Sequence, residues 1–337
     1  MRSILKYNRG MDILGNFKKG TVLVIGDLVM DHFIWGKVRR ISPEAPVPVV
    51  EVNSESLILG GAANVVNNIH SLGGMVLVCG VIGKDDAGKK LVHELKQKGI
   101  PSDGIIVEGD RPTSVKTRII AHSQQVVRFD REKRNKIHFD AMKAIIDHTK
   151  KKIGSVDAIV ISDYAKGVIS EELMEEVINI ARKKNKPVAV DPKVSHFDFY
   201  KNVSIITPNN DEASQASGID IEDNASLLRA GDVLLKKLGS DAILITRGEH
   251  GMSLFENNGG ITHIPTVAKE VYDVSGAGDT VIGTVALAIA SGASFKEAAV
   301  ISNFAAGIVV GKVGTATVTP EELKKAVENR LGAKKGR

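Results

Sequence analysis

The sequence predicts an α/β protein in which a doubly wound, mostly parallel sheet is flanked by helices and carries a small antiparallel β lid. Short apolar runs that are typical of buried strands alternate with segments of helical periodicity along most of the chain. Two stretches interrupt this alternation and show no helical period. The composition, 43% hydrophobic and 25% charged over 337 residues, is that of a globular protein with a large core.

The predicted strands begin with the run TVLVIG at residues 21–26, which ends in glycine. Similar runs occupy residues 75–81, 157–162, 187–190, 204–207 and 241–246. Helical patterns separate or follow them at residues 62–72, 87–98, 140–151, 171–184, 225–238, 278–291, 295–310 and 320–331. A continuously apolar strand is buried on both faces, so the pattern predicts a parallel sheet with helices on either side.

The two interruptions, at residues 32–55 and 112–131, have the character of short strands. The first contains three prolines, at positions 43, 46 and 48. We expect both stretches to join in one small antiparallel sheet that projects from the main domain as a lid. The main domain then spans residues 20–332, with an N-terminal extension at residues 1–19 and a basic tail at residues 333–337.

Composition and charge exclude several classes of protein. Lys and Arg number 45 against 40 for Asp and Glu, and aromatic residues make up 4%, too few for the stacking platforms of a single-strand nucleic-acid binder. The N-terminus lacks the apolar core of a signal peptide, and the most apolar stretch, residues 281–290, is half the ~20 residues of a membrane span. We expect a cytoplasmic protein with no nucleic-acid or membrane partner. A single cysteine, Cys79, excludes a disulfide framework.

The strongest chemical signal is the segment DVSGAGDT at residues 273–280, which leads into an apolar helix. Its glycines allow unusual backbone conformations, and the amides at the helix start can converge on an anion. Asp279 would then lie beside that anion on the first helical turn. Phosphoryl transfer to a hydroxyl needs this pairing, because amides stabilise the transferring group while a carboxylate takes the proton. The alternative is an ordinary helix N-terminus with a favourably placed Asp.

Two other phosphate-binding motifs are missing from the sequence. The segment GVIGKD at residues 80–85 has the wrong spacing for a P-loop and lacks its hydroxyl residue. No Gly-x-Gly-x-x-Gly follows the first predicted strand, where a dinucleotide-binding fold would have it. Neither a P-loop ATPase nor a standard NAD enzyme is favoured.

A second signal pairs two acids with a glycine-rich turn. Asp27 and Asp31 follow the first predicted strand, at the end where α/β proteins bind ligands. Gly60 and Gly61 precede a predicted helix, with Asn64 on its first turn. Carboxylates and amides suit sugar hydroxyls. Taken singly, each piece is better explained by turn formation and helix capping.

The segments at residues 60–64 and 273–279 resemble the two signatures of the ribokinase-like (PfkB) carbohydrate kinases, and the likeness extends from about residue 21 to about residue 331. The strings RISPEAPVPVV at 40–50, SDYAKG at 162–167 and GTATV at 314–318 are similar to the branch of this family that acts on heptose 7-phosphate. The resemblance implies a ribokinase-like fold. It also implies ATP-dependent phosphorylation of D-glycero-D-manno-heptose 7-phosphate at O1, in the synthesis of ADP- or GDP-heptose for lipopolysaccharide or S-layers.

The resemblance also implies roles for the matching residues on the sugar side. Asp279 would be the base that deprotonates the anomeric hydroxyl, and Gly276, Ala277 and Gly278 would form the anion hole. The residues implied for sugar binding are Asp27, Asp31, Gly60, Gly61, Asn64 and Asp279, with Arg128 and Lys166 for the 7-phosphate and Arg118 and Lys116 as further candidates. Arginine and lysine side chains on a lid are also commonly solvated or placed at a dimer interface.

On the ATP side, Asn209 and Glu212 match the family's Asn-x-x-Glu motif and would place Mg²⁺ through water. The other residues implied for ATP binding are Lys193, Thr246, Arg247, Gly248, Gly251, Gly276, Gly278 and Asn303, and Asp273 would help to hold a monovalent cation such as K⁺. Gly248 and His250 stand where the heptose kinases commonly carry Ser and Gln. Asn209 could equally be a helix cap, Lys193 a solvated loop lysine and Asn303 a satisfied core amide.

The residues leave the exact activity open. Another kinase of the same family, acting on fructose 1-phosphate, ribose or a nucleoside, would share the general motifs. A sugar- or nucleotide-binding sensor would keep the binding residues without catalysis. No His-x-Gly-His motif of a fused nucleotidyltransferase occurs, so we expect a kinase alone, forming a homodimer through its β lid.

Overall fold

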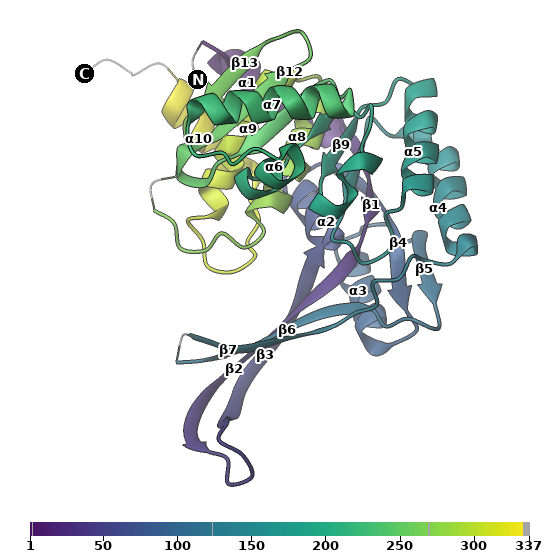
Figure 1. Ribbon diagram of the computed structural model, residues 1–337, viewed down its shortest axis with the longest axis vertical. Coiled ribbons are helices and arrows are strands. Elements are labelled where there is room, and N and C mark those ends of the chain that lie inside the picture. The colour runs from purple at the N-terminus through teal and green to yellow at the C-terminus, as the bar shows by residue number, and fades with distance from the viewer. Residues whose placement is uncertain (2, 123, 269, 333–337) are drawn as a thin grey trace.

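The computed structural model describes residues 1, 3–122, 124–268 and 270–332. A nine-stranded sheet lies between helices, and a second sheet of four strands projects from it as a long arm (Figure 1). The predicted fold class is thereby confirmed. The predicted basic tail at residues 333–337 lies outside the described residues.

The main sheet is formed, in spatial order, by β13 (Ile261–Ile264), β12 (Met252–Glu256), β11 (Ala242–Thr246), β10 (Ile205–Ile206), β9 (Val188–Asp191), β8 (Ala158–Ser162), β1 (Thr21–Gly26), β4 (Met75–Gly83) and β5 (Gly104–Glu108). The pairings from β11 through to β5 are parallel, and β12 and β13 add antiparallel pairings at one edge. The carboxyl ends of the parallel strands therefore meet along one edge, where α/β proteins bind ligands.

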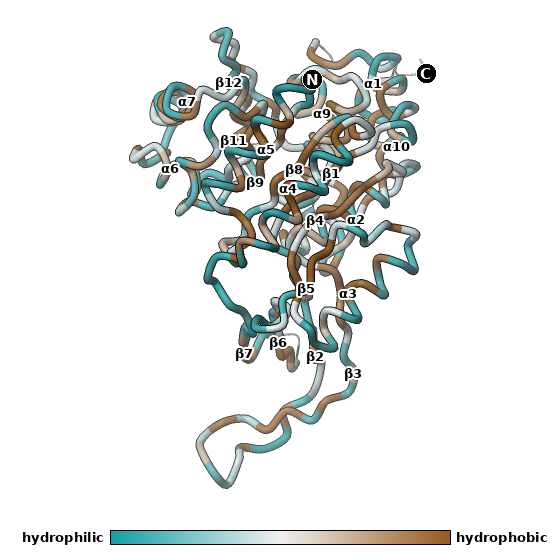
Figure 2. The backbone as a smooth tube through the Cα atoms, turned by 90° about the vertical axis from the view of Figure 1, so that its right-hand side faces the viewer, coloured by the Kyte–Doolittle hydropathy of each residue, from teal (hydrophilic) through white to brown (hydrophobic). Residues whose placement is uncertain are grey.

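Both faces of the main sheet are covered, which explains why its strands are apolar throughout. Along β1, Val22 and Val24 pack on one face, and Leu23 and Ile25 pack on the other. The first face is covered by α1 (Tyr7–Asn16), α2 (Ala62–Ser71), α3 (Asp86–Gln97), α8 (Ala277–Ala290), α9 (Phe295–Val309) and α10 (Pro320–Leu331). The second is covered by α4 (Phe139–Lys152), α5 (Glu171–Lys183), α6 (Asn210–Ser217) and α7 (Asn224–Leu238). The central strands are accordingly the most hydrophobic part of the backbone trace (Figure 2).

The N-terminal residues that we expected as an extension are part of this domain. Helix α1 packs against α10, and the side chains of Leu5 and Ile13 are fully buried in the core. Arg9 pairs with Glu297 at the start of α9. None of the described helices is both long and apolar enough to cross a membrane.

The lid sheet consists of β3 (Pro48–Gly61), β2 (Leu28–Ile41), β6 (Ser114–Ala121) and β7 (Gln124–Arg131), in that order. Each hairpin, β2–β3 and β6–β7, is antiparallel, as expected. The two hairpins join through β2 and β6, which pair in parallel. Strand β2 starts one residue after β1, and β3 leads directly into α2, so the lid is continuous with two core elements.

Candidate active site

The predicted site residues gather where the parallel strands end and α8 begins. Asp27 follows β1, Tyr164 follows β8, Asp191 ends β9, and Thr246 ends β11. The N-terminus of α8 faces this edge, bringing Asp279 to it on the first helical turn. A helix start at the carboxyl ends of parallel strands provides amide donors and a positive dipole end for an anionic ligand.

Helix α8 can begin here because Gly276 precedes it with a φ of +77°. A Cβ atom at that position would lie 2.9 Å from both the Asn64 amide nitrogen and a methyl carbon of Thr315. Glycine is therefore required for its conformation and for the close approach of α2. This packing lets the side chain of Asn64 reach the residue at the first turn of α8.

The Asp279 carboxylate is buried and held from two sides. Asn64 Nδ2 donates to one oxygen at 2.6 Å, and the Tyr164 hydroxyl donates to the other at 2.7 Å. Burial raises the pKa of Asp279 to about 6, against the opposing effect of these two hydrogen bonds. A carboxylate with this pKa is ionised at neutral pH and basic enough to accept a proton from a hydroxyl.

Some backbone amides at the start of α8 already donate a hydrogen bond within the protein, and others are available to a ligand. The Ala277 amide donates to the carbonyl of Val274 at 3.1 Å, which counts against its predicted place in the anion hole. The amides of Gly278 and Asp279 have no acceptor within the described part of the chain. These two amides are the donors that the structure offers to an anion.

Asp27, predicted as a sugar ligand, is used differently. Its carboxylate is buried and accepts three backbone amides, those of Tyr164 at 2.9 Å, Lys166 at 3.0 Å and Val168 at 3.1 Å. Both oxygens are thus taken up by the turn that follows β8. The geometry favours a structural role for Asp27, in fixing that turn, over contact with a sugar hydroxyl.

Asp31 and the glycines of the 60–61 turn form a unit at the base of the lid. Asp31 pairs with Arg118 of β6, and its carboxylate lies so close to Gly60 that a Cβ there would overlap it. Gly61 adopts a φ of +53° just before α2. The predicted sugar-side residues Asp31, Gly60 and Asn64 are therefore brought together next to Asp279.

A cavity of about 180 Å³ lies beside Asp279 on the side of β9 to β11. It is lined by Asp163, Tyr164, Asp191, Pro192, Lys193, Thr207, Asn209, Glu212, Thr246 and Gly278. Five residues predicted for ATP or Mg²⁺ from the sequence, namely Lys193, Asn209, Glu212, Thr246 and Gly278, are thus brought together.

Acidic groups crowd this cavity. Burial raises the pKa of Glu212 and raises that of Asp191 well above its ordinary value, and the charges of Asp279 and Glu212 raise the latter further. One oxygen of Glu212 caps α6 by accepting the amide of Asn209, whose own side chain accepts the Glu212 amide. Carboxylate and amide oxygens suit Mg²⁺, and a divalent cation would relieve the repulsion between these acids. The residues present therefore fit Mg²⁺.

The remaining residues predicted for ATP lie outside the lining of this cavity. Asn303 is buried and donates to the carbonyl of Pro265 at 2.8 Å, as a satisfied core amide would. Arg247, Gly248 and Gly251 form the turn between β11 and β12, where the Arg247 amide donates to the Gly251 carbonyl. Their predicted nucleotide contacts stay predictions.

The lid contributes a cluster of cations. Burial lowers the pKa of Lys116, and the charges of Lys166, Arg128 and Arg118 lower it further, against the opposing charge of Asp31. Arg128 forms two hydrogen bonds to Asp130, while Lys166 forms a buried ion pair with Glu132. The cluster comprises Lys116, Arg118 and Arg128 of the lid and Lys166 of the turn after β8, the four candidates for the 7-phosphate. The three lid side chains lie on the same face of the lid sheet as Asp31.

Among the residues at the site that were assigned no role from the sequence, Tyr164 and Asp191 are the most informative. Tyr164 donates a hydrogen bond to Asp279, and it lies within the SDYAKG string that carries the resemblance. Asp191 lines the cavity, and like Asp27 it directly follows a predicted strand. The position at a strand end could have singled out Asp191. No local pattern reveals the contact of Tyr164.

A helix-borne base, free amides, an acidic cavity and a lid with cations define a kinase of small hydroxylated substrates. The family model for pfkB family carbohydrate kinases matches residues 19–322, and the chain belongs to that family. Among curated relatives, the "Bifunctional protein HldE" of Citrifermentans bemidjiense is 51% identical over 301 residues, covering 89% of this chain and 62% of the relative. That of Geobacter sulfurreducens is 49% identical, with 89% and 61% covered. The chain thus spans a little under two thirds of these relatives.

Solved structures confirm the fold. An Arabidopsis thaliana ribokinase complexed with ribose and ATP has a TM-score of 0.73 at 19% identity, covering 92% of this chain and 99% of that one. Escherichia coli phosphofructokinase-2, in complex with substrates and products, has a TM-score of 0.74 at 17% identity, with 92% and 99% covered.

The role of Asp27 can be tested by its effect on stability. We expect Asp27→Asn to lower the free energy of unfolding by about 3 kcal/mol, because an amide group would face backbone donors that now meet an ionised acceptor. Urea unfolding followed by circular dichroism measures the change. Asp157→Asn is the matched control, since Asp157 accepts a single backbone amide, that of Thr21, and should cost less. Full stability of Asp27→Asn together with weakened sugar binding would instead support the sugar-ligand role.

Proposed function

We propose that this chain transfers the γ-phosphate of ATP to O1 of D-glycero-D-manno-heptose 7-phosphate, giving heptose 1,7-bisphosphate for ADP- or GDP-heptose synthesis. The observation that carries the proposal is the position of Asp279, between the acidic cavity on the nucleotide side and the cationic cluster of the lid. The relatives named HldE, with about half of their aligned residues identical to this chain, support the heptose substrate.

In the proposed reaction, Asp279 accepts the proton of the O1 hydroxyl as its oxygen attacks the γ-phosphorus. A bond forms between O1 and phosphorus, the bond from phosphorus to the bridging oxygen of ADP breaks, and ADP leaves. The free amides of Gly278 and Asp279 stabilise the transferring group. Lys193 would contact the phosphates on the other side, and Asn209 and Glu212 would hold Mg²⁺ through water, where the ion would supply charge neutralisation. The lid covers the sugar and excludes water that would otherwise hydrolyse ATP.

The lid cations explain why a sugar phosphate is favoured over a neutral sugar. Lys116 and Arg118 project from β6 on the side of Asp31, and the partly buried Lys116 makes no ion pair among the described residues. A dianionic phosphate would supply the missing negative charge. A coupled assay of ADP release with heptose 7-phosphate, fructose 1-phosphate, ribose and adenosine tests this choice. Binding of sugar phosphate without ADP release from any of them would favour the sensor alternative.

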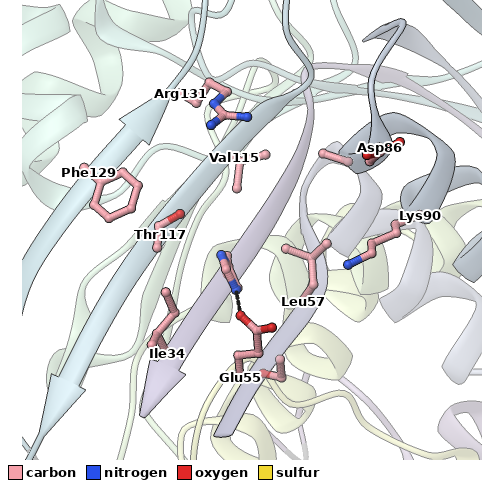
Figure 3. Close-up of a pocket in the computed structure, with 12 residues that line it drawn as sticks. Ile34, Glu55, Leu57, Asp86, Lys90, Val115, Thr117, Phe129 and Arg131 are labelled. Atoms are coloured by element: carbon pink, nitrogen blue, oxygen red, sulfur yellow. Dashed lines mark hydrogen bonds and ion pairs between the residues drawn. The ribbon is translucent and has the colours of Figure 1, made fainter. Parts of the chain in front are cut away.

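A homodimer through the lid is part of the proposal. The lid face opposite Lys116 carries exposed apolar side chains, with Phe129 and Val127 52% and 46% exposed. A hollow of about 520 Å³ opens there beside α3, and Figure 3 shows Phe129, Thr117 and Ile34 lining it from the lid strands. A second lid would bury this surface. Sedimentation as a monomer at micromolar concentration would contradict the dimer.

The proposal includes K⁺ near the start of α8. Asp273 accepts the amides of Ser275 at 2.8 Å and Gly314 at 3.1 Å, which ties two loops together next to the anion hole. A monovalent cation would strengthen this tie, and E. coli phosphofructokinase-2 has been solved in complex with potassium. Equal activity in potassium and choline chloride would contradict it.

Asp279→Asn tests the base directly. We expect kcat to fall roughly 10²–10⁴-fold, because the amide accepts no proton, while the fold and the KM values for both substrates change little. The coupled ADP assay and a thermal unfolding curve measure the two properties. A kcat close to that of the wild type would overturn the assignment of Asp279 as the base.

The pH dependence of kcat should show the titration of the same carboxyl. In the unliganded protein the pKa of Asp279 is raised to about 6, and the carboxyl takes up a proton as the pH falls, so activity is lost on the acid side. Measuring kcat at saturation keeps the titration of free sugar phosphate out of the profile. A flat profile down to pH 5 would contradict the prediction.

Lys166→Met tests the 7-phosphate site. We expect the KM for heptose 7-phosphate to rise about 10-fold or more, since a charged hydrogen bond to phosphate is lost, with the KM for ATP unchanged. Lys236→Met is the control, because Lys236 forms an ion pair with Asp232 on α7, away from the lid. If neither Lys166→Met nor Arg128→Met raised the KM for the sugar, the 7-phosphate would have to bind elsewhere.

A further inference from the structure

Tyr164 is anchored at three points, each on a different element. Its backbone amide donates to Asp27 after β1, and its hydroxyl donates to Asp279 on α8 at 2.7 Å. Its ring lies under the ammonium of Lys116 on lid strand β6, with 4.9 Å from the nitrogen to the ring centroid. One side chain therefore joins the base of the reaction to a cation of the lid.

In the hydrogen bond between Tyr164 and Asp279, the tyrosine hydroxyl is the donor. Burial raises the pKa of the Tyr164 hydroxyl well above its ordinary value, and the charge of Asp279 raises it further, so the group stays protonated and donates. Since Asn64 occupies the other carboxylate oxygen, each oxygen of Asp279 has one protein donor. A carboxylate has about four acceptor positions, so room remains for the hydroxyl of a substrate.

The contact with Lys116 is also directional. An ammonium over the face of an aromatic ring is attracted by the ring's negative face, and the attraction grows where water is excluded. Lys116 is partly buried, and Tyr164 lines the nucleotide cavity. Tyr164 therefore both lines the acidic cavity and contacts a cation of the lid.

We propose that Tyr164 is a positioning residue of the kinase, whose hydroxyl orients the Asp279 carboxylate and whose ring aligns Lys116 of the lid with that carboxylate. This inference rests on the proposed function of Asp279 as the base. It assigns the hydroxyl and the ring of one side chain to two separable tasks. Loss of the hydroxyl affects proton transfer, and loss of the ring affects the binding of the sugar phosphate.

Tyr164→Phe separates the first task, because it keeps the ring beside Lys116 and removes only the hydroxyl. Without this donor the ionised carboxylate of Asp279 is less stabilised, so the acid limb of the kcat profile should move to higher pH by about one unit. The KM for heptose 7-phosphate should stay unchanged. An acid limb at the wild-type position would overturn this part of the proposal.

Tyr200→Phe is the matched control for the pH profile. Tyr200 is also buried and donates to a carboxylate, Asp163, at 2.6 Å, but it does not contact Asp279. Its loss should lower stability while leaving the midpoint of the acid limb in place. An equal shift in Tyr200→Phe and Tyr164→Phe would show a general effect of deleting a buried hydroxyl and would overturn the specific role.

Tyr164→Leu tests the second task by removing the ring as well. We expect it to raise the KM for heptose 7-phosphate several-fold above that of Tyr164→Phe, since Lys116 loses its aromatic support. Equal KM values in the two variants would overturn the role of the ring.

The activity of Asp279→Asn distinguishes failure of the positioning role of Tyr164 from failure of the proposed function of Asp279. If Asp279→Asn is inactive and Tyr164→Phe is unshifted, the positioning role fails and the proposed function stands. If Asp279→Asn is fully active, Asp279 is not the base, and the positioning role of Tyr164 is overturned with it.

Discussion

The carboxylate of Asp279 has to be buried and yet ionised, and the surrounding structure is arranged to meet both conditions. Burial favours the neutral form, and charge-assisted hydrogen bonds from Asn64 and Tyr164 oppose it. Asn64 is fixed in turn by Asn68, which donates to its carbonyl and accepts the hydroxyl of Thr280. Polar bonds therefore tie α2 to α8 at the point where the base lies, while apolar packing holds the rest of the two helices together.

The parallel sheet creates a second constraint, because its strands deliver several acids to one edge. Asp163 gives its oxygens to the amide of Ala165, the hydroxyl of Tyr200 and the ring of His196. Asp27 likewise accepts three backbone amides of the turn after β8, whereas Asp163 links that turn to the segment that holds His196 and Tyr200. Asp191 retains its position on the cavity. Two of the neighbouring acids, Asp27 and Asp163, therefore accept structural hydrogen bonds, while Asp191 lines the cavity where a cation can bind.

The fold could be predicted from the sequence because its determinants are local. Val22 and Leu23 are adjacent and both buried, which a strand in a covered parallel sheet explains, and Gly276 marks the start of α8. The role of Asp27 could not be predicted, since its partner Tyr164 is 137 residues away. Lys166 was predicted as a cation for phosphate, but no local pattern shows that Glu132 already pairs with it. Residue type and position along a strand indicate where a side chain lies, and long-range contacts decide what it does.

The attachment of the lid has a mechanical consequence. Strand β2 leaves β1 after the single residue Asp27, and β3 enters α2 with no loop between them, so this hairpin has no flexible joint at its root. Any bending of this hairpin would act directly on Asp27, between β1 and β2, and on α2, which carries Asn64. An insertion of one residue at the start of β2 would move the side chains of that strand to the opposite face of the lid. The tip, residues 42–47, lies outside both strands, so a change in length there would leave the pairing of β2 with β3 intact.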